Sequence, residues 1–169
     1  MSRRLLRPQS GFTIVEMVIV TCIIAVLASI AISSVREYSL RAKISEVVMA
    51  AGTCKNVVQE SYPVRDEPPA AGEWGCESSN SATSYAGAVQ TNSHGVIRIT
   101  IQNMDSLLNG RHIFLVPARS DNLTALMTPN DLGTPVRSWM CGSDWLLARK
   151  ALPANCRLDM TTYSSEEYN

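Results

Sequence analysis

The chain has 169 residues, 46% of them hydrophobic, with 15 basic and 15 acidic side chains. Three arginines, Arg3, Arg4 and Arg7, stand among the first eleven residues, and without those eleven the remaining 12 basic and 15 acidic side chains leave a net charge of −3. This length suits one globular domain plus an anchor. The mildly acidic remainder argues against general nucleic-acid binding, which depends on Lys and Arg neutralising phosphates.

The first predicted element is an apolar helix over residues 12–32, whose only charged side chain is Glu16. At about 1.5 Å per residue, a helix of this length covers a hydrocarbon core about 30 Å thick. The preceding arginines should keep the N-terminal end in the cytoplasm. A cleaved secretory signal is the alternative, but no small-x-small cleavage pattern follows the apolar run.

The helix is predicted to continue to about Tyr62, because residues 35–62 contain no proline and one glycine, Gly52. Pro63 should end the helix, since a proline disfavours helical geometry in the residue before it. Apolar residues recur here at steps of three and four, which predicts an amphipathic helix whose apolar stripe needs a cover. The stripe consists of Ile44, Val47, Val48, Ala51, Cys54 and Val58.

The remainder of the chain should supply that cover. Residues 63–95 are rich in Pro, Gly, Ser and Asn and are predicted to form a loop. Strands are predicted at Val96–Ile101, at His112–Val116 with an end at Pro117, more weakly at Leu123–Met127, and at Val136–Cys141. A twisted antiparallel sheet packed on the helix stripe would bury both surfaces, so the predicted fold class is α+β.

The five cysteines divide between the two regions. Cys22 lies in the apolar run, where it is most simply a small apolar residue, and the other four, Cys54, Cys76, Cys141 and Cys156, lie in the polar remainder. Four cysteines outside an anchor suggest two disulfides and an oxidising compartment, with three possible pairings. A zinc site is the alternative, but no CxxC or HxxxH spacing supports it.

The N-terminal pattern of Gly11, Phe12, Thr13 and Glu16 before an apolar run of about twenty residues resembles the type IV pilins with a short basic leader. The resemblance implies that a prepilin peptidase cuts after Gly11 and methylates the new amine of Phe12. It also implies that Glu16 acts in assembly. A carboxylate that merely reaches for headgroups at the membrane boundary is the plainer interpretation of Glu16.

The resemblance continues along the chain. Arg41–Gly52 looks like the helix segment of major pilins, and Gly95–Thr100 and Ile113–Pro117 look like strands of their sheet. The segments Trp139–Cys141 and Leu152–Arg157 are similar to the closing disulfide loop of the family. This implies a Cys141–Cys156 disulfide, which encloses 14 residues and leaves Cys54–Cys76 as the second pair.

The resemblance implies a pilin fold with four parts: a cleaved leader at 1–11, a transmembrane and filament-core helix at 12–34, its amphipathic half at 35–62, and a globular part at 63–169. The expected function is that of a structural subunit of a type IV pilus that serves adhesion, twitching motility or DNA uptake. The expected partners are further copies of the chain, the prepilin peptidase, the assembly machinery and the inner membrane. The protein would leave that membrane for an extracellular pilus.

Two alternatives stay open. Many major pilins have a helix-breaking glycine and proline where this chain has Ala25 and Ser33, which keeps a minor pilin or a type II secretion pseudopilin in view. A signal-anchored periplasmic domain is the other alternative. The sequence contains no recognisable catalytic, phosphate-binding or metal-ligating motif, so we expect no enzyme activity, cofactor or metal.

Overall fold

The computed structural model describes residues 11–120 and 124–169, apart from the side chain of Ser33. Residues 1–10 of the predicted leader, with its three arginines, lie outside the described residues. The chain divides into two compact units, one ending at Tyr38 and one from Ser39 to Asn169. The second unit, from Ser39 to Asn169, is the head.

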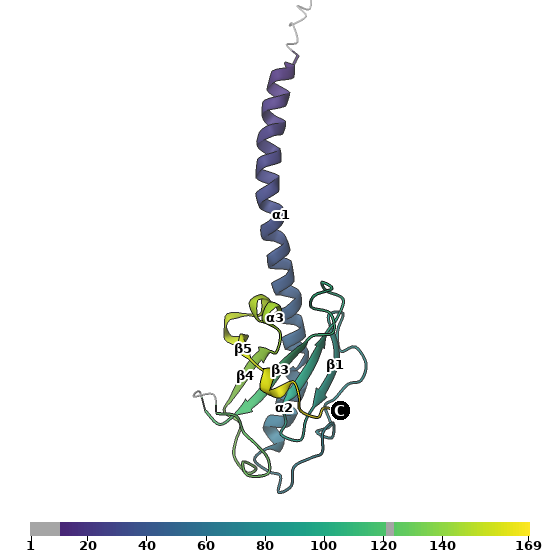
Figure 1. Ribbon diagram of the computed structural model, residues 1–169, viewed down its shortest axis with the longest axis vertical. Helices are drawn as coiled ribbons and strands as arrows, with labels where there is room; N and C mark the ends of the chain where they lie inside the picture. The colour runs from purple at the N-terminus through teal and green to yellow at the C-terminus, as the bar shows by residue number, and fades with distance from the viewer. Residues whose placement is uncertain (1–10, 121–123) are drawn as a thin grey trace, which may run out of the picture. The chain divides into compact units, whose positions relative to one another are not determined.

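Two helices replace the single helix that the sequence predicts. Helix α1 covers Ile14–Ala50 and α2 covers Gly52–Ser61, with Ala51 between them in a turn (Figure 1). The predicted long helix is thus present as the run Ile14–Ser61, interrupted only by the turn at Ala51, whose backbone stays in the right-handed helical region. Gly52 explains the break, because glycine is the weakest helix former after proline. The second helix ends just before Pro63, as predicted.

The apolar stripe of the helices forms the core of the head. Ile44, Val47, Ala51, Cys54 and Val58 are at most 1% exposed. The first four of them pack in one cluster with side chains of the sheet, namely Ile97, Ile99, Ile101, Ile113 and Leu115. Burying one large aliphatic side chain contributes about 1.5–3 kcal/mol, so this contact between helix and sheet is a main source of the stability of the head.

The sheet has five strands in the order of the sequence. They are β1 (Ala86–Thr91), β2 (Ile97–Ile101), β3 (His112–Ala118), β4 (Ser138–Ser143) and β5 (Leu158–Asp159). The first four strands pair antiparallel, which confirms the α+β fold with an antiparallel sheet. The short β5 pairs parallel with β4, which the sequence did not indicate.

Three details of the predicted sheet are wrong. Strand β1 lies in the segment predicted as loop. Strand β3 continues through Pro117 to Ala118; the pairing of β3 with β2 stops at Leu115, so the missing N–H of the proline costs no bond on that side. In the described part of 123–127, only Ala125 forms a β-bridge, with Ala118.

The outer face of the sheet is also covered. After helix α3 (Leu146–Ala151) and the short turns η1 (Ala154–Cys156) and η2 (Thr161–Tyr163), the chain returns across this face (Figure 1). Tyr168 packs there with the outer-face residues Phe114 and Val116 of β3 in a second apolar cluster. The sheet of the head therefore buries apolar side chains on both faces.

Candidate functional site

The apolar segment, residues 12–32, presents its side chains to the surroundings on every side. Phe12 is 80% exposed and Ile14 83%, and the other large aliphatic residues of the segment are at least 46% exposed. The hydroxyls of Thr21 and Ser29 donate to backbone carbonyls one turn back, so these polar groups are satisfied within the helix. Such a surface requires lipid or other apolar helices as its cover.

Glu16 and Thr13 form a capping box at the start of α1. The hydroxyl oxygen of Thr13 accepts a hydrogen bond from the Glu16 N–H at 3.3 Å. In return Oε2 of Glu16 accepts from the backbone N–H and from the hydroxyl of Thr13, both at 2.8 Å. Within the described residues no hydrogen bond reaches Oε1 of Glu16, so that oxygen is available to an external donor.

Gly11 and Phe12 lie just before this box, and both are exposed. A Cβ built on Gly11 would have no atom of the described residues within 4 Å, so these residues leave the peptide bond between Gly11 and Phe12 open to an approaching protein. The box uses the N–H of Thr13, which stays an amide even if the chain is cut before Phe12.

Two disulfides join parts of the head. Cys54 of α2 is joined to Cys76, with 5.0 Å between their Cα atoms, and Cys141 of β4 is joined to Cys156 of η1, with 4.4 Å between theirs. The first ties the segment after the helix back to α2. The second holds the segment that contains α3 against β4. Cys22 is a free thiol in the apolar segment.

Glu77 organises the segment beside the first disulfide. Its carboxylate accepts hydrogen bonds from the backbone N–H groups of Trp74, Gly75 and Cys76, each at 2.9 Å, and from the hydroxyl of Thr91 on β1. Burial alone would raise the pKa of Glu77, but these hydrogen bonds outweigh it and lower the pKa. An ionised Glu77 therefore fixes this segment to the edge of the sheet.

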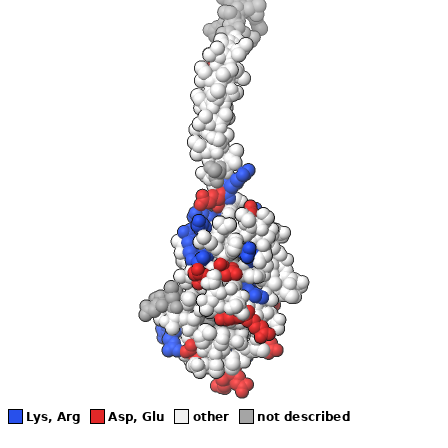
Figure 2. Space-filling view, in the orientation of Figure 1, with Lys and Arg blue, Asp and Glu red and all other residues white. Residues whose placement is uncertain are grey.

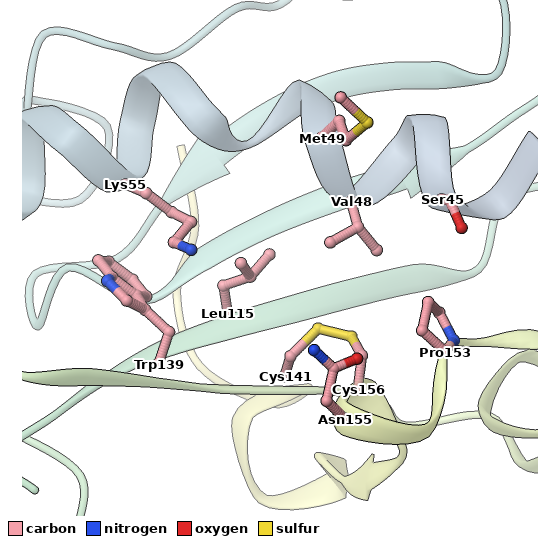
Figure 3. A pocket seen from close by; sticks show the side chains of 10 residues that line it. All are labelled: Ser45, Val48, Met49, Lys55, Leu115, Trp139, Cys141, Pro153, Asn155 and Cys156. Atoms are coloured by element: carbon pink, nitrogen blue, oxygen red, sulfur yellow. A yellow bond between two sulfur atoms is a disulfide. The ribbon is translucent and has the colours of Figure 1, made fainter. Parts of the chain in front are cut away.

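The head also has a groove of about 380 Å³ between the helices and the second disulfide (Figure 3). Its lining residues are Ser45, Val48, Met49, Lys55, Leu115, Trp139, Cys141, Pro153, Asn155 and Cys156. The ammonium of Lys55 lies 5.6 Å from the centroid of the Trp139 ring. The groove can thus receive an apolar side chain, and the Lys55 ammonium can donate to an acceptor group next to that side chain. The Cys141–Cys156 disulfide forms part of the wall of the groove.

Comparison with protein families shows which class of protein the chain belongs to. A family described as Pilin (bacterial filament) matches residues 40–157, which is most of the head. The chain belongs to the pilin family. A second family, the prokaryotic N-terminal methylation motif, matches residues 6–32, which include Gly11, Phe12, the capping box and the apolar segment.

Curated relatives of this pilin agree with the family match. The type IV major pilin protein PilE of Neisseria gonorrhoeae is 25% identical, and a fimbrial protein of Neisseria meningitidis serogroup A is 27% identical. Each alignment covers 88% of this chain and 94% of the relative. The fimbrial protein EcpC of Eikenella corrodens is 29% identical over 88% of this chain and 91% of its own length.

These matches make the protein a type IV pilin and a structural subunit of fimbriae. A pilin with a methylation motif and an exposed apolar helix is a membrane-anchored precursor that becomes part of an extracellular pilus. Sequence reasoning singled out Glu16 but missed its partner Thr13. The spacing Thr-x-x-Glu is the signal of a capping box and was readable in the sequence.

Proposed function

We propose that the precursor is cut between Gly11 and Phe12 by a prepilin peptidase, that the new amine of Phe12 is methylated, and that the inner-membrane assembly machinery then adds the subunit to a homopolymeric pilus. The span of the methylation motif and the open surroundings of Gly11 support this proposal. The fibre would serve adhesion, twitching motility or DNA uptake, which are properties of the assembled polymer.

Glu16 is the residue on which assembly depends in this proposal. It carries the only charge of the apolar segment, and its Oε1 is available while Oε2 is held by Thr13. Once apolar helices surround the carboxylate, an unpaired charge is costly, and a cation from a neighbouring subunit offsets much of that cost. The Phe12 amine of a neighbour is such a cation, so the pair would favour one stagger between adjacent helices.

The test separates processing from assembly. In the Glu16→Ala variant we expect cleavage after Gly11 to continue and fibres to be lost, because apolar packing remains while the stagger is no longer selected. Mass spectrometry of the membrane fraction measures cleavage and methylation, and the yield of sheared fibres measures assembly. Gly11→Leu is the matched control, which should accumulate as uncut precursor. Normal fibre yield from Glu16→Ala would overturn the role given to this residue.

A further inference from the structure

Helix α3 has an unusual distribution of its apolar residues. The small residues Ala148 and Ala151 are buried, with 0% and 8% exposure, whereas the large residues Leu146 and Leu147 are 56% and 41% exposed. Lys150 is exposed beside them. An ordinary surface helix buries its large apolar residues, so a pair of exposed leucines next to a cation indicates a surface that meets something apolar.

Further side chains of the same character lie at this end of the head. The register of β3 with β4 pairs Ile113 with Ser143, which brings the residues before β3 next to those after β4. The guanidinium carbon of Arg111 accordingly lies 3.8 Å from the centroid of the Trp145 ring. Leu107, in the segment between β2 and β3, is 59% exposed.

The helix portion of the head begins at the same end. The ammonium of Lys43 lies 5.0 Å from the centroid of the Tyr85 ring, and the Tyr85 carbonyl accepts from the N–H of Gln102, just after β2. Lys43 is thus near the start of β1 and the end of β2, where Arg111 and Trp145 also lie. Figure 1 shows α3 beside the first turns of α1 in the head.

The chain limits how far the start of the head can lie from the end of the apolar segment. The apolar segment ends at Ile32 and the head begins at Ser39. The seven steps from Ile32 to Ser39 can span no more than about 25 Å, even when fully extended. The polar headgroup layer occupies roughly the first 5–8 Å outside the hydrocarbon core. The link is therefore short enough to allow the end of the head that begins at Ser39 to meet that layer.

We propose that the surface formed by Leu107, Arg111, Trp145, Leu146, Leu147 and Lys150 docks onto the phospholipid surface while the pilin waits in the membrane. Leu146 and Leu147 enter the boundary between headgroups and acyl chains, and Arg111 and Lys150 meet lipid phosphates. Asp105, between β2 and β3, and Asp144, directly after β4, lie at the same end and limit the attraction to phosphates. Arg149 is paired with Asp159. The exposed leucines therefore contribute most of the binding.

This surface would be released when the subunit joins the fibre. The inference rests on the membrane-anchored precursor but not on the proposed roles of Gly11 and Glu16. It goes beyond those roles because it assigns the head a contact of its own with lipid before assembly.

The test uses the full chain in vesicles of phosphatidylethanolamine and phosphatidylglycerol. A photoactivatable benzophenone amino acid replaces Leu146 or Leu147, and Val64 as the matched control. Val64 is 76% exposed and follows α2, at the opposite end of the helices of the head. We expect at least about tenfold more lipid adduct at 146 and 147 than at 64, since one buried leucine side chain is worth a factor of this size.

Two results would overturn the proposal. One is a lipid adduct at 146 and 147 no greater than at 64. The other is an adduct with a second copy of the chain in place of lipid, which would make the surface a contact between subunits.

The second measurement compares the unlabelled parent chain with a Leu146→Gln, Leu147→Gln double variant in the same vesicles. Amide hydrogen exchange of residues 144–151 should be slower in the parent chain than in the double variant. Equal exchange would also contradict the proposal. Neither measurement requires cleavage or assembly, so failure here is distinguishable from failure of the proposed function.

Discussion

Thr13 and Glu16 satisfy each other at the first turn of α1: the Thr13 hydroxyl accepts the Glu16 N–H, and the Glu16 carboxylate accepts the Thr13 N–H and hydroxyl. The carboxylate therefore has a partner within its own chain before any neighbour arrives. This explains how one acidic side chain is accommodated at the edge of an otherwise uncharged segment, in contrast to the head, where the charged side chains gather (Figure 2).

The capping box predicts different outcomes for two substitutions of Thr13. Thr13→Ser keeps a hydroxyl and should leave the start of the helix unchanged. Thr13→Val keeps the shape but removes the hydroxyl, and loss of an N-cap costs about 1 kcal/mol. Amide hydrogen exchange of residues 14–17 in membranes should be about fivefold faster in Thr13→Val than in Thr13→Ser. Equal exchange in both variants would mean that the box does not hold the helix end.

The second prediction concerns Glu77 and pH. Because its pKa is lowered in the folded head, its contribution to stability is fully present above the ordinary Glu pKa of about 4.3 and is lost as pH falls through the folded value. Glu77→Gln should flatten the dependence of unfolding free energy on pH below about 4.3 and lower stability at neutral pH by about 1 kcal/mol.

The control for this measurement is Glu73→Gln. Glu73 is exposed in the same segment, and no hydrogen bond to its carboxylate is present among the described residues. Denaturant unfolding of the head, followed by near-ultraviolet circular dichroism at several pH values, provides the comparison. If both variants kept the acid-induced loss of stability of the parent chain, Glu77 would not be its source.

Much of the fold could be predicted from periodicity. The steps of three and four in the helix stripe and the alternation in Val96–Ile101 are strong local signals, and the structure confirms them in α1, α2 and β2. Strand β1 could not be predicted this way, because Ala86, Gly87 and Ala88 have little strand preference. Ala86 pairs with Ile101 of β2, and the register shifts between Ala86 and Val89.

The same division holds for the functional residues. Gly11, Phe12 and Glu16 are marked by their order in a short motif, which a sequence displays directly. Glu77 is different, because its partners include backbone N–H groups and a threonine 14 residues away, and only the folded chain brings these together. The exposed leucines of α3 were equally hidden, since the sequence does not show which side of a six-residue helix is buried.

The third prediction uses the second disulfide. Loss of a bridge with a sequence separation of 15 costs about 3 kcal/mol in the chain-entropy account, so the double variant Cys141→Ser, Cys156→Ser should unfold at clearly lower denaturant. Cys22→Ser is the control and should leave the unfolding of the head unchanged, because this free thiol lies in the apolar segment. A parent chain whose unfolding midpoint was the same with and without reductant would contradict the prediction.

The last prediction tests the contact between β4 and β5. Gly142 of β4 pairs with Leu158 of β5, and a Cβ at Gly142 would fall on the Leu158 carbonyl group. Since backbone cannot move aside as a flexible side chain can, Gly142→Ala should lower the unfolding free energy by about 1–3 kcal/mol. Gly52→Ala is the matched control, because a Cβ there meets no atom within 4 Å in the part of the chain that the structure describes, and alanine favours helix. Gly52→Ala should therefore be neutral or raise the unfolding free energy by up to about 1 kcal/mol. Equal unfolding midpoints for the two variants would show that β5 is not held closely against β4.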